Sequence, residues 1–201
     1  MIELLIDVAD QLGVIQAVKG KLLRQPDPAA EKLVIALDEI YKIYGSMNDE
    51  ISTYLGLWFD PSNPPIEQRK TLISFEGGEI KARMGKARGH CHKIFNIYLR
   101  YLKPWFSTVL STNEAHIMEK IFHSFRELDI SMLDNIDHLA YWLSKEATVT
   151  LDLLDAGNLD EANRRVQAAR KEIQPDRLAL AKAMRDLLDL QAEFIEVSGT
   201  V

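Results

Sequence analysis

The chain has very few of the residues on which disulfide-stabilised folds and metal centres depend. Its 201 residues include one cysteine, which excludes an intrachain disulfide framework and any multi-cysteine zinc or iron–sulfur site. Long uncharged apolar runs are missing too, because the best one, residues 51–59, has half of the roughly 18 residues that a membrane span needs. The first residues also lack the positively charged region of a signal peptide. We therefore expect a cytoplasmic protein with no transmembrane segment.

Proline and glycine are sparse, with 7 and 10 residues, and they divide the chain into long segments. Within these segments apolar residues recur every three or four positions, which is the period of an amphipathic helix. The clearest stripe consists of Leu33, Leu37, Ile40, Tyr44, Met47, Ile51, Tyr54 and Trp58. No segment shows the sustained alternation that is typical of a strand. The sequence predicts an all-α fold.

Cap and turn signals set the expected order of the helices. Asp27-Pro28 predicts an N-cap followed by the first residue of a helix, and the prolines within 60–65 predict a loop. A third segment, 66–103, has Gly77-Gly78 as a possible interruption. Pro104 is expected to end or kink this segment, because a proline disfavours helix in the residue before it.

Further signals divide the second half of the chain. Thr112 or Asn113 is the expected cap of the next helix, Gly157-Asn158 a stop, and Pro175 the start of the last helix. We predict an antiparallel bundle of five or six helices, three of them long, in a single domain over residues 1–201. A shorter C-terminal helical hairpin over 158–197 is a second possibility.

Charge is distributed unevenly along the chain. The whole sequence has a formal net charge of −6, whereas residues 66–103 carry +6 and the remainder −12. Ile80 to Lys103 contains seven bases and no acid. In an acidic protein such an asymmetry indicates a surface for an anionic partner.

A helical projection of this basic segment places its glycines together. The apolar stripe there consists of Ile80, Met84, Ala87, Cys91, Ile94, Tyr98 and Tyr101, and Gly78, Gly85 and Gly89 fall near the centre of the opposite face. Glycine destabilises a helix by about 1 kcal/mol relative to alanine, so three in register suggest a close neighbour. The candidate partner-binding residues are Lys81, Lys86, Arg88, His92, Lys93, Arg100, Lys103, Gly85 and Gly89. The neighbour is an acidic helix of the same chain, a protein partner or second copy, a nucleic acid, or an anionic membrane surface.

Catalytic and metal-binding patterns are few. Arg83 and His90 have the spacing of the arginine–histidine motif in ribonucleases of the HEPN family, but eleven arginines and five histidines give about one such spacing by chance. His116, Glu119 and His123 can share a helix face, yet they form too small a ligand set for a stable metal site. We predict no metal and no cofactor.

The sequence favours a non-catalytic helical interaction or regulatory module. It is expected to form a homo-oligomer or to bind a protein partner through its long amphipathic helices, with the basic, glycine-lined face of 80–103 taking an acidic partner. The alternatives are a nucleic-acid-binding module, a metal-independent ribonuclease that uses Arg83 and His90, and a module at an anionic membrane surface. The identity of the partner is not encoded in any recognisable motif.

Overall fold

The computed structural model describes residues 3–24, 27–62 and 66–198, and the side chains of 13–24, 27–62, 66–127 and 138–196. Within these residues it contains seven α-helices, one π-helical segment and no strand. The predicted all-α class is confirmed. The number of helices is larger than the predicted five or six, because the segment 66–109 is divided more often than expected.

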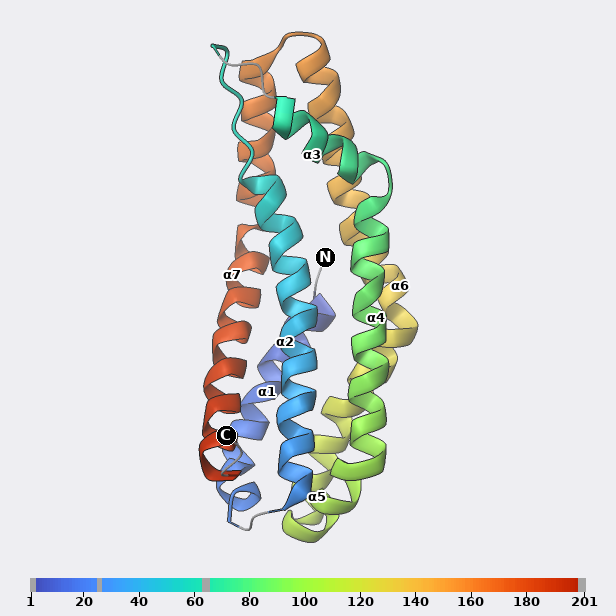
Figure 1. Cartoon of the computed structure of the whole chain (residues 1–201), viewed down its shortest axis with the longest axis vertical. Helices are drawn as coiled ribbons and strands as arrows, with labels where there is room; N and C mark the ends of the chain where they lie inside the picture. Colours follow the sequence, from blue (N-terminus) through green and yellow to red (C-terminus); the bar gives the residue numbers. More distant parts are fainter. Residues whose placement is uncertain (1–2, 25–26, 63–65, 199–201) are drawn as a thin grey trace.

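The core lies between helices that run along the length of the molecule. The elements are α1 (Glu3–Leu22), α2 (Pro28–Leu55), α3 (Ile66–Glu76), α4 (Glu79–Ile97), the π-helical segment η1 (Tyr98–Leu102), α5 (Lys103–Val109), α6 (Thr112–Asp155) and α7 (Leu159–Ser198). Helix α2 packs against α4 and α7, and α6 packs against the same two helices (Figure 1). Helix α1 lies against α6 and α7 near one end, and α3 crosses the other end against α6 and α4 (Figure 1).

Helix α2 forms as its sequence predicts. The Asp27 side chain accepts a 2.7 Å hydrogen bond from the backbone N–H of Ala29, and Pro28 is the first helical residue. Seven of the eight residues in the predicted apolar stripe are buried, whereas Trp58 is 61% exposed because α2 ends at Leu55. The stripe is therefore used by the chain's own core, and self-association would need a different surface.

The segment after α3 has the predicted break at Gly78 and, at Pro104, an irregular turn instead of a helix end. Gly78 has a φ of 78°, which glycine adopts readily, and α4 begins at the next residue. Pro104 does not end the helix, although it has no N–H to donate to the Arg100 carbonyl. The chain passes this point through the π-helical turn η1 and continues into α5. The wider turn shifts the register, so Tyr101, which we expected in the buried stripe, is 46% exposed.

Helix α6 spans the segment predicted for it, whereas α7 is longer than predicted. Helix α6 is capped by Ser111, one residue before the predicted caps, in a capping box with Glu114. Gly157, with a φ of 71°, follows α6, as predicted. Helix α7 then runs through Pro175 without a break, so the predicted helix start at that proline is wrong and 158–197 does not form a hairpin. Pro175 is exposed, and buried residues on both sides of it hold α7 in the bundle.

Candidate interaction surface on helix α4

Helix α4 is oriented by its apolar side. The residues of the predicted stripe from Ile80 to Tyr98 are all buried, and they pack against α2 and α6. This packing directs the remaining sides of the helix differently: one edge meets α2, and the side with Gly85 and Gly89 faces outward.

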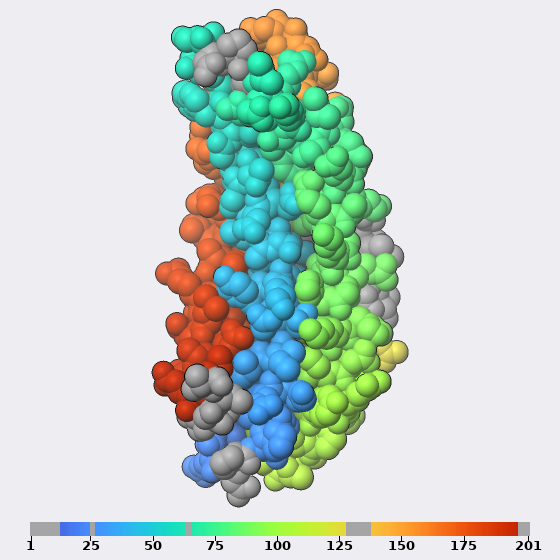
Figure 2. All heavy atoms as spheres, in the orientation of Figure 1, coloured from blue at the N-terminus to red at the C-terminus, as the bar shows by residue number. Residues whose placement is uncertain are grey.

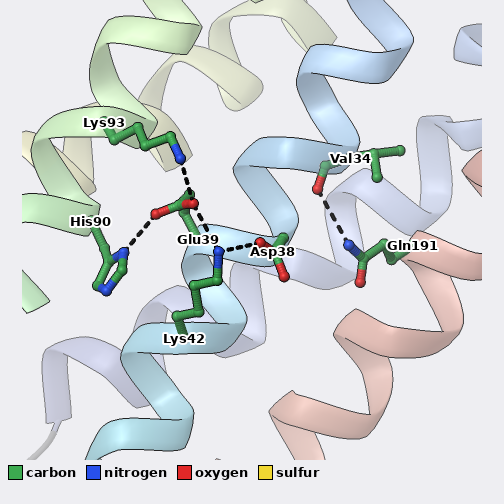
Figure 3. Close-up of polar contacts among 7 residues, drawn as sticks. All are labelled: Val34, Asp38, Glu39, Lys42, His90, Lys93 and Gln191. Atoms are coloured by element: carbon green, nitrogen blue, oxygen red, sulfur yellow. Dashed lines mark hydrogen bonds and ion pairs between the residues drawn. The ribbon is translucent and has the colours of Figure 1, made fainter.

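The edge of α4 next to α2 is held by a buried carboxylate. Glu39 of α2 is 2% exposed, and its Oε2 lies 2.5 Å from Nδ1 of His90 (Figure 3). Its Oε1 accepts hydrogen bonds from Lys93 at 2.7 Å and from Lys42 at 3.1 Å. One acid of α2 thus binds two basic residues of α4, which fixes the positions of the two helices relative to each other.

The environment of Glu39 keeps it charged. Burial would raise its pKa, because a carboxylate is poorly solvated inside a protein. Hydrogen bonds from Lys93, His90 and Lys42 outweigh burial and lower the pKa from 4.5 to about 2. Glu39 is therefore a structural anion at neutral pH, and Lys93, one of the predicted partner-binding residues, is already paired within the chain.

Arg83 is paired with α2 in the same way. Its Nε and Nη2 donate to the two carboxylate oxygens of Glu50 at 2.6 and 3.0 Å, and its guanidinium lies 5.8 Å from the centroid of the Phe75 ring. The hydrogen bond to Glu50 raises the pKa of Arg83. Arg83 and His90, the alternative ribonuclease pair, are thus each bound to a separate carboxylate of α2.

Three other predicted residues also have partners in the chain. Lys103 donates to Glu119 of α6 at 2.8 Å, and this bond lowers the pKa of Glu119. Lys81 and Arg88 each have a further interaction partner. The chain's own acids therefore account for part of the basic segment.

The predicted weak ligand set lies around Glu119. Nδ1 of His116 and Nε2 of His123 are each 3.8 Å from its carboxylate oxygens, beside a cavity of about 370 Å³. In the portion of the chain with described side chains, no three His, Cys, Asp or Glu residues are grouped so that they could hold a metal ion. The histidines interact with Glu119 as members of an exposed polar cluster.

The outward side of α4 is uncovered. A Cβ added at Gly85 or Gly89 would meet no atom within 4 Å. Lys86, His92 and Arg100 are exposed, and within the described residues none of these three has a hydrogen bond or ion pair. We call these five residues the outer basic face. Figure 2 shows the α4 segment, in green, along one side of the molecule with no other helix in front of it.

The sequence analysis missed the acids that hold α4. Glu39 and Glu50 lie on the side of α2 that also carries the buried Ala36 and Ile43. An acid on the buried side of a helix faces a neighbouring element. The spacing of Glu39 and Glu50 relative to the apolar residues could therefore have indicated that they pair with another helix. A second buried carboxylate was missed as well: Glu146 of α6 accepts two hydrogen bonds from the half-buried Arg165 of α7, at 2.5 and 2.6 Å.

No family model, curated protein or solved structure matches the chain. Among the described residues, none of the helices combines the length and the apolar character needed to cross a membrane. The outer basic face is therefore the feature of the structure that bears on function.

Proposed function

We propose that the chain is a non-catalytic helical interaction module, an antiparallel bundle whose outer basic face binds an acidic helix of a protein. The observation that carries this proposal is the pair of uncovered glycines, Gly85 and Gly89, among exposed bases that have no partner within the described residues. The exposed bases Lys86, His92 and Arg100 are available to a partner. In contrast, Arg83, His90 and Lys93 are bound to carboxylates of α2.

The glycines favour a helix as the ligand. Each destabilises α4 by roughly 1 kcal/mol relative to alanine, and no atom of the described residues packs into the space that the missing side chain leaves. A second helix can approach the α4 backbone more closely here than over any larger residue. The positive charge of Lys86, next to Gly85, and of Arg100, in η1 beyond the end of α4, selects an acidic helix, since opposite charges steer and orient association.

The alternative functions receive less support from the geometry. For a ribonuclease site at Arg83 and His90, an RNA would have to displace Glu50 from Arg83 and Glu39 from His90, and both carboxylates repel phosphate. An interfacial helix inserts bulky apolar residues along its length. Large exposed apolar residues flank only one end of the outer basic face, where Leu99 and Tyr101 lie on either side of Arg100, and α4 itself has none.

A charge-reversal experiment tests the proposal. The probe is a fluorescently labelled synthetic helical peptide rich in glutamate, and binding is followed by anisotropy. We expect the triple variant Lys86→Glu, His92→Glu and Arg100→Glu to weaken binding by about tenfold or more. Wild-type binding should weaken with added salt, because the contacts are exposed.

The control variant reverses three exposed bases elsewhere, Lys120, Lys145 and Lys171, which have no ion pair within the described residues. Both variants should keep the wild-type circular dichroism and melting temperature, since exposed substitutions usually change stability by less than about 0.5 kcal/mol. Equal loss in the control would contradict the proposal. The proposal would also be contradicted if the wild-type protein did not bind the peptide and instead bound or cleaved polyuridine, or bound phosphatidylserine vesicles.

A further inference from the structure

The C-terminal part of α7 is negatively charged, opposite in sign to the outer basic face. Residues 186–196 contain four acids, Asp186, Asp189, Glu193 and Glu196, and no base. Glu193 is paired with Lys19 of α1 at 2.5 Å. The other three are exposed and have no hydrogen bond or ion pair within the described residues.

Apolar side chains accompany these acids. Leu188 is 46% exposed and Ile195 is 39% exposed, and the small residue Ala192 is also on the surface. We call the exposed residues of 186–196 the acidic end of α7. It combines negative charge with apolar area, as the surface of a protein interface does.

The acidic end of α7 and the outer basic face of α4 lie on different sides of one molecule. Each of the two helices packs against both α2 and α6, so they occupy diagonal positions in the bundle. Figure 1 shows α7 along one edge of the molecule and α4 along the opposite edge. The outward sides of these two helices therefore cannot meet within one chain, and only a second copy brings them together.

We propose that the acidic end of α7 in one copy docks on the outer basic face of α4 in the next. This inference rests on the proposed function and names the acidic helix as part of a second copy of this chain. The spacing of the charges supports it: Lys86 and His92 are six residues apart, about 9 Å along a helix, and Asp189 and Glu196 are seven apart, about 10.5 Å.

The small residues are placed to match. Gly89 lies midway between Lys86 and His92, and Ala192 lies near the middle between Asp189 and Glu196. When the charges of the two helices face each other, the smallest side chains meet at the centre of the contact. This arrangement lets the helix backbones approach closely while the charged side chains pair around them.

The contact joins two different surfaces, so it is heterologous. Each copy that uses one surface keeps the other available, and assembly continues into a ring or an open chain. The protein should therefore form a concentration-dependent series of assemblies that added salt dissociates.

Sedimentation velocity of the full chain tests the inference with two variants. The basic-face variant is Lys86→Glu, His92→Glu and Arg100→Glu, and the acidic-end variant is Asp186→Lys, Asp189→Lys and Glu196→Lys. We expect each variant alone to weaken self-association by about tenfold or more, whereas the control variant of Lys120, Lys145 and Lys171 assembles like wild type. A mixture of the two reversed variants should restore a complex, because one native acidic end then meets one native basic face.

The outcomes separate this inference from the proposed function. If the acidic-end variant assembles like wild type, or if wild-type protein stays monomeric over the whole concentration range, the inference is wrong. The proposed function still stands in that case if the basic-face variant loses the acidic peptide. Should the triple acidic-end variant fold poorly by circular dichroism, the milder Asp189→Asn with Glu196→Gln must still weaken assembly, and an unchanged assembly would overturn the inference.

Discussion

Replacing Glu39 by glutamine removes the charge that joins α2 to α4 while it keeps the size of the side chain. The pKa of Glu39 is lowered from 4.5 to about 2 in the folded protein. The folded state therefore binds the proton less readily than the unfolded state, and the charged form favours folding. A shift of this size corresponds to about 3 kcal/mol of stability at pH 7.

The pH dependence follows from the direction of the shift. The contribution of Glu39 is complete above its unfolded pKa of 4.5, and it is lost as the pH falls toward about 2. Glu39→Gln should therefore lower the free energy of unfolding by about 3 kcal/mol at pH 7 and by much less near pH 2. The single oxygen of glutamine can still accept from Lys93, and its NH2 group then faces Nδ1 of His90, so the backbone arrangement of the two helices should be preserved.

Urea unfolding at a series of pH values between about 7 and 2 measures this difference. The matched control is Glu67→Gln, because the Glu67 side chain is 82% exposed and, among the residues that the structure describes, pairs only with Lys70 three residues away. Its effect should stay below about 1 kcal/mol at every pH. A difference between wild type and Glu39→Gln that does not change with pH would refute the assigned role of the Glu39 charge.

Four other substitutions test the helix geometry and the pairing of Glu146 with Arg165, in urea unfolding or thermal melts. Gly89→Ala should stabilise the protein by about 0.5–1 kcal/mol because its Cβ meets nothing within 4 Å, whereas Gly157→Ala should destabilise it by about 1 kcal/mol because Gly157 has a φ of 71°. Pro175→Ala should raise the melting temperature, since it restores a backbone hydrogen bond inside α7, and an unchanged or lower value would contradict this. Glu146→Gln should lower the free energy of unfolding by about 1–3 kcal/mol, because Arg165 loses its paired carboxylate. A loss under about 0.5 kcal/mol would show that the pair does not stabilise the fold.

Local signals in the sequence predicted the start and the buried side of α2 and the break at Gly77-Gly78. These features depend on residues within a few positions of each other: a cap at Asp27, a proline at the first helical position, and a glycine with positive φ. The error at Pro175 has a different cause. Buried residues before and after it, such as Ile173 and Leu180, hold one helix together although the proline removes a hydrogen bond.

The basic segment was recognisable from charge alone. The sequence did not show which of its bases pair within the chain and which stay exposed. Which bases pair inside the chain depends on the register of α4 against α2, and that register places Lys93 and His90 opposite Glu39. Lys86 lies on the same side of α4, one turn before His90, yet it has no hydrogen bond or ion pair within the described residues. Helical periodicity gives the face of a residue on its own helix, while its ionic partner is set by packing between helices.

Disulfide trapping between two copies tests the central contact most directly. The background is Cys91→Ala, which removes the chain's one cysteine, a buried residue. A copy with Gly89→Cys is mixed under mild oxidation with a copy carrying Ala192→Cys, or with a control copy carrying Gln167→Cys at an exposed position nearer the start of α7. We expect a cross-linked dimer from Gly89→Cys with Ala192→Cys, which high salt prevents, and little from the control pair. Equal cross-linking in both mixtures, or none with Ala192→Cys, would contradict the docking of α7 on the outer basic face.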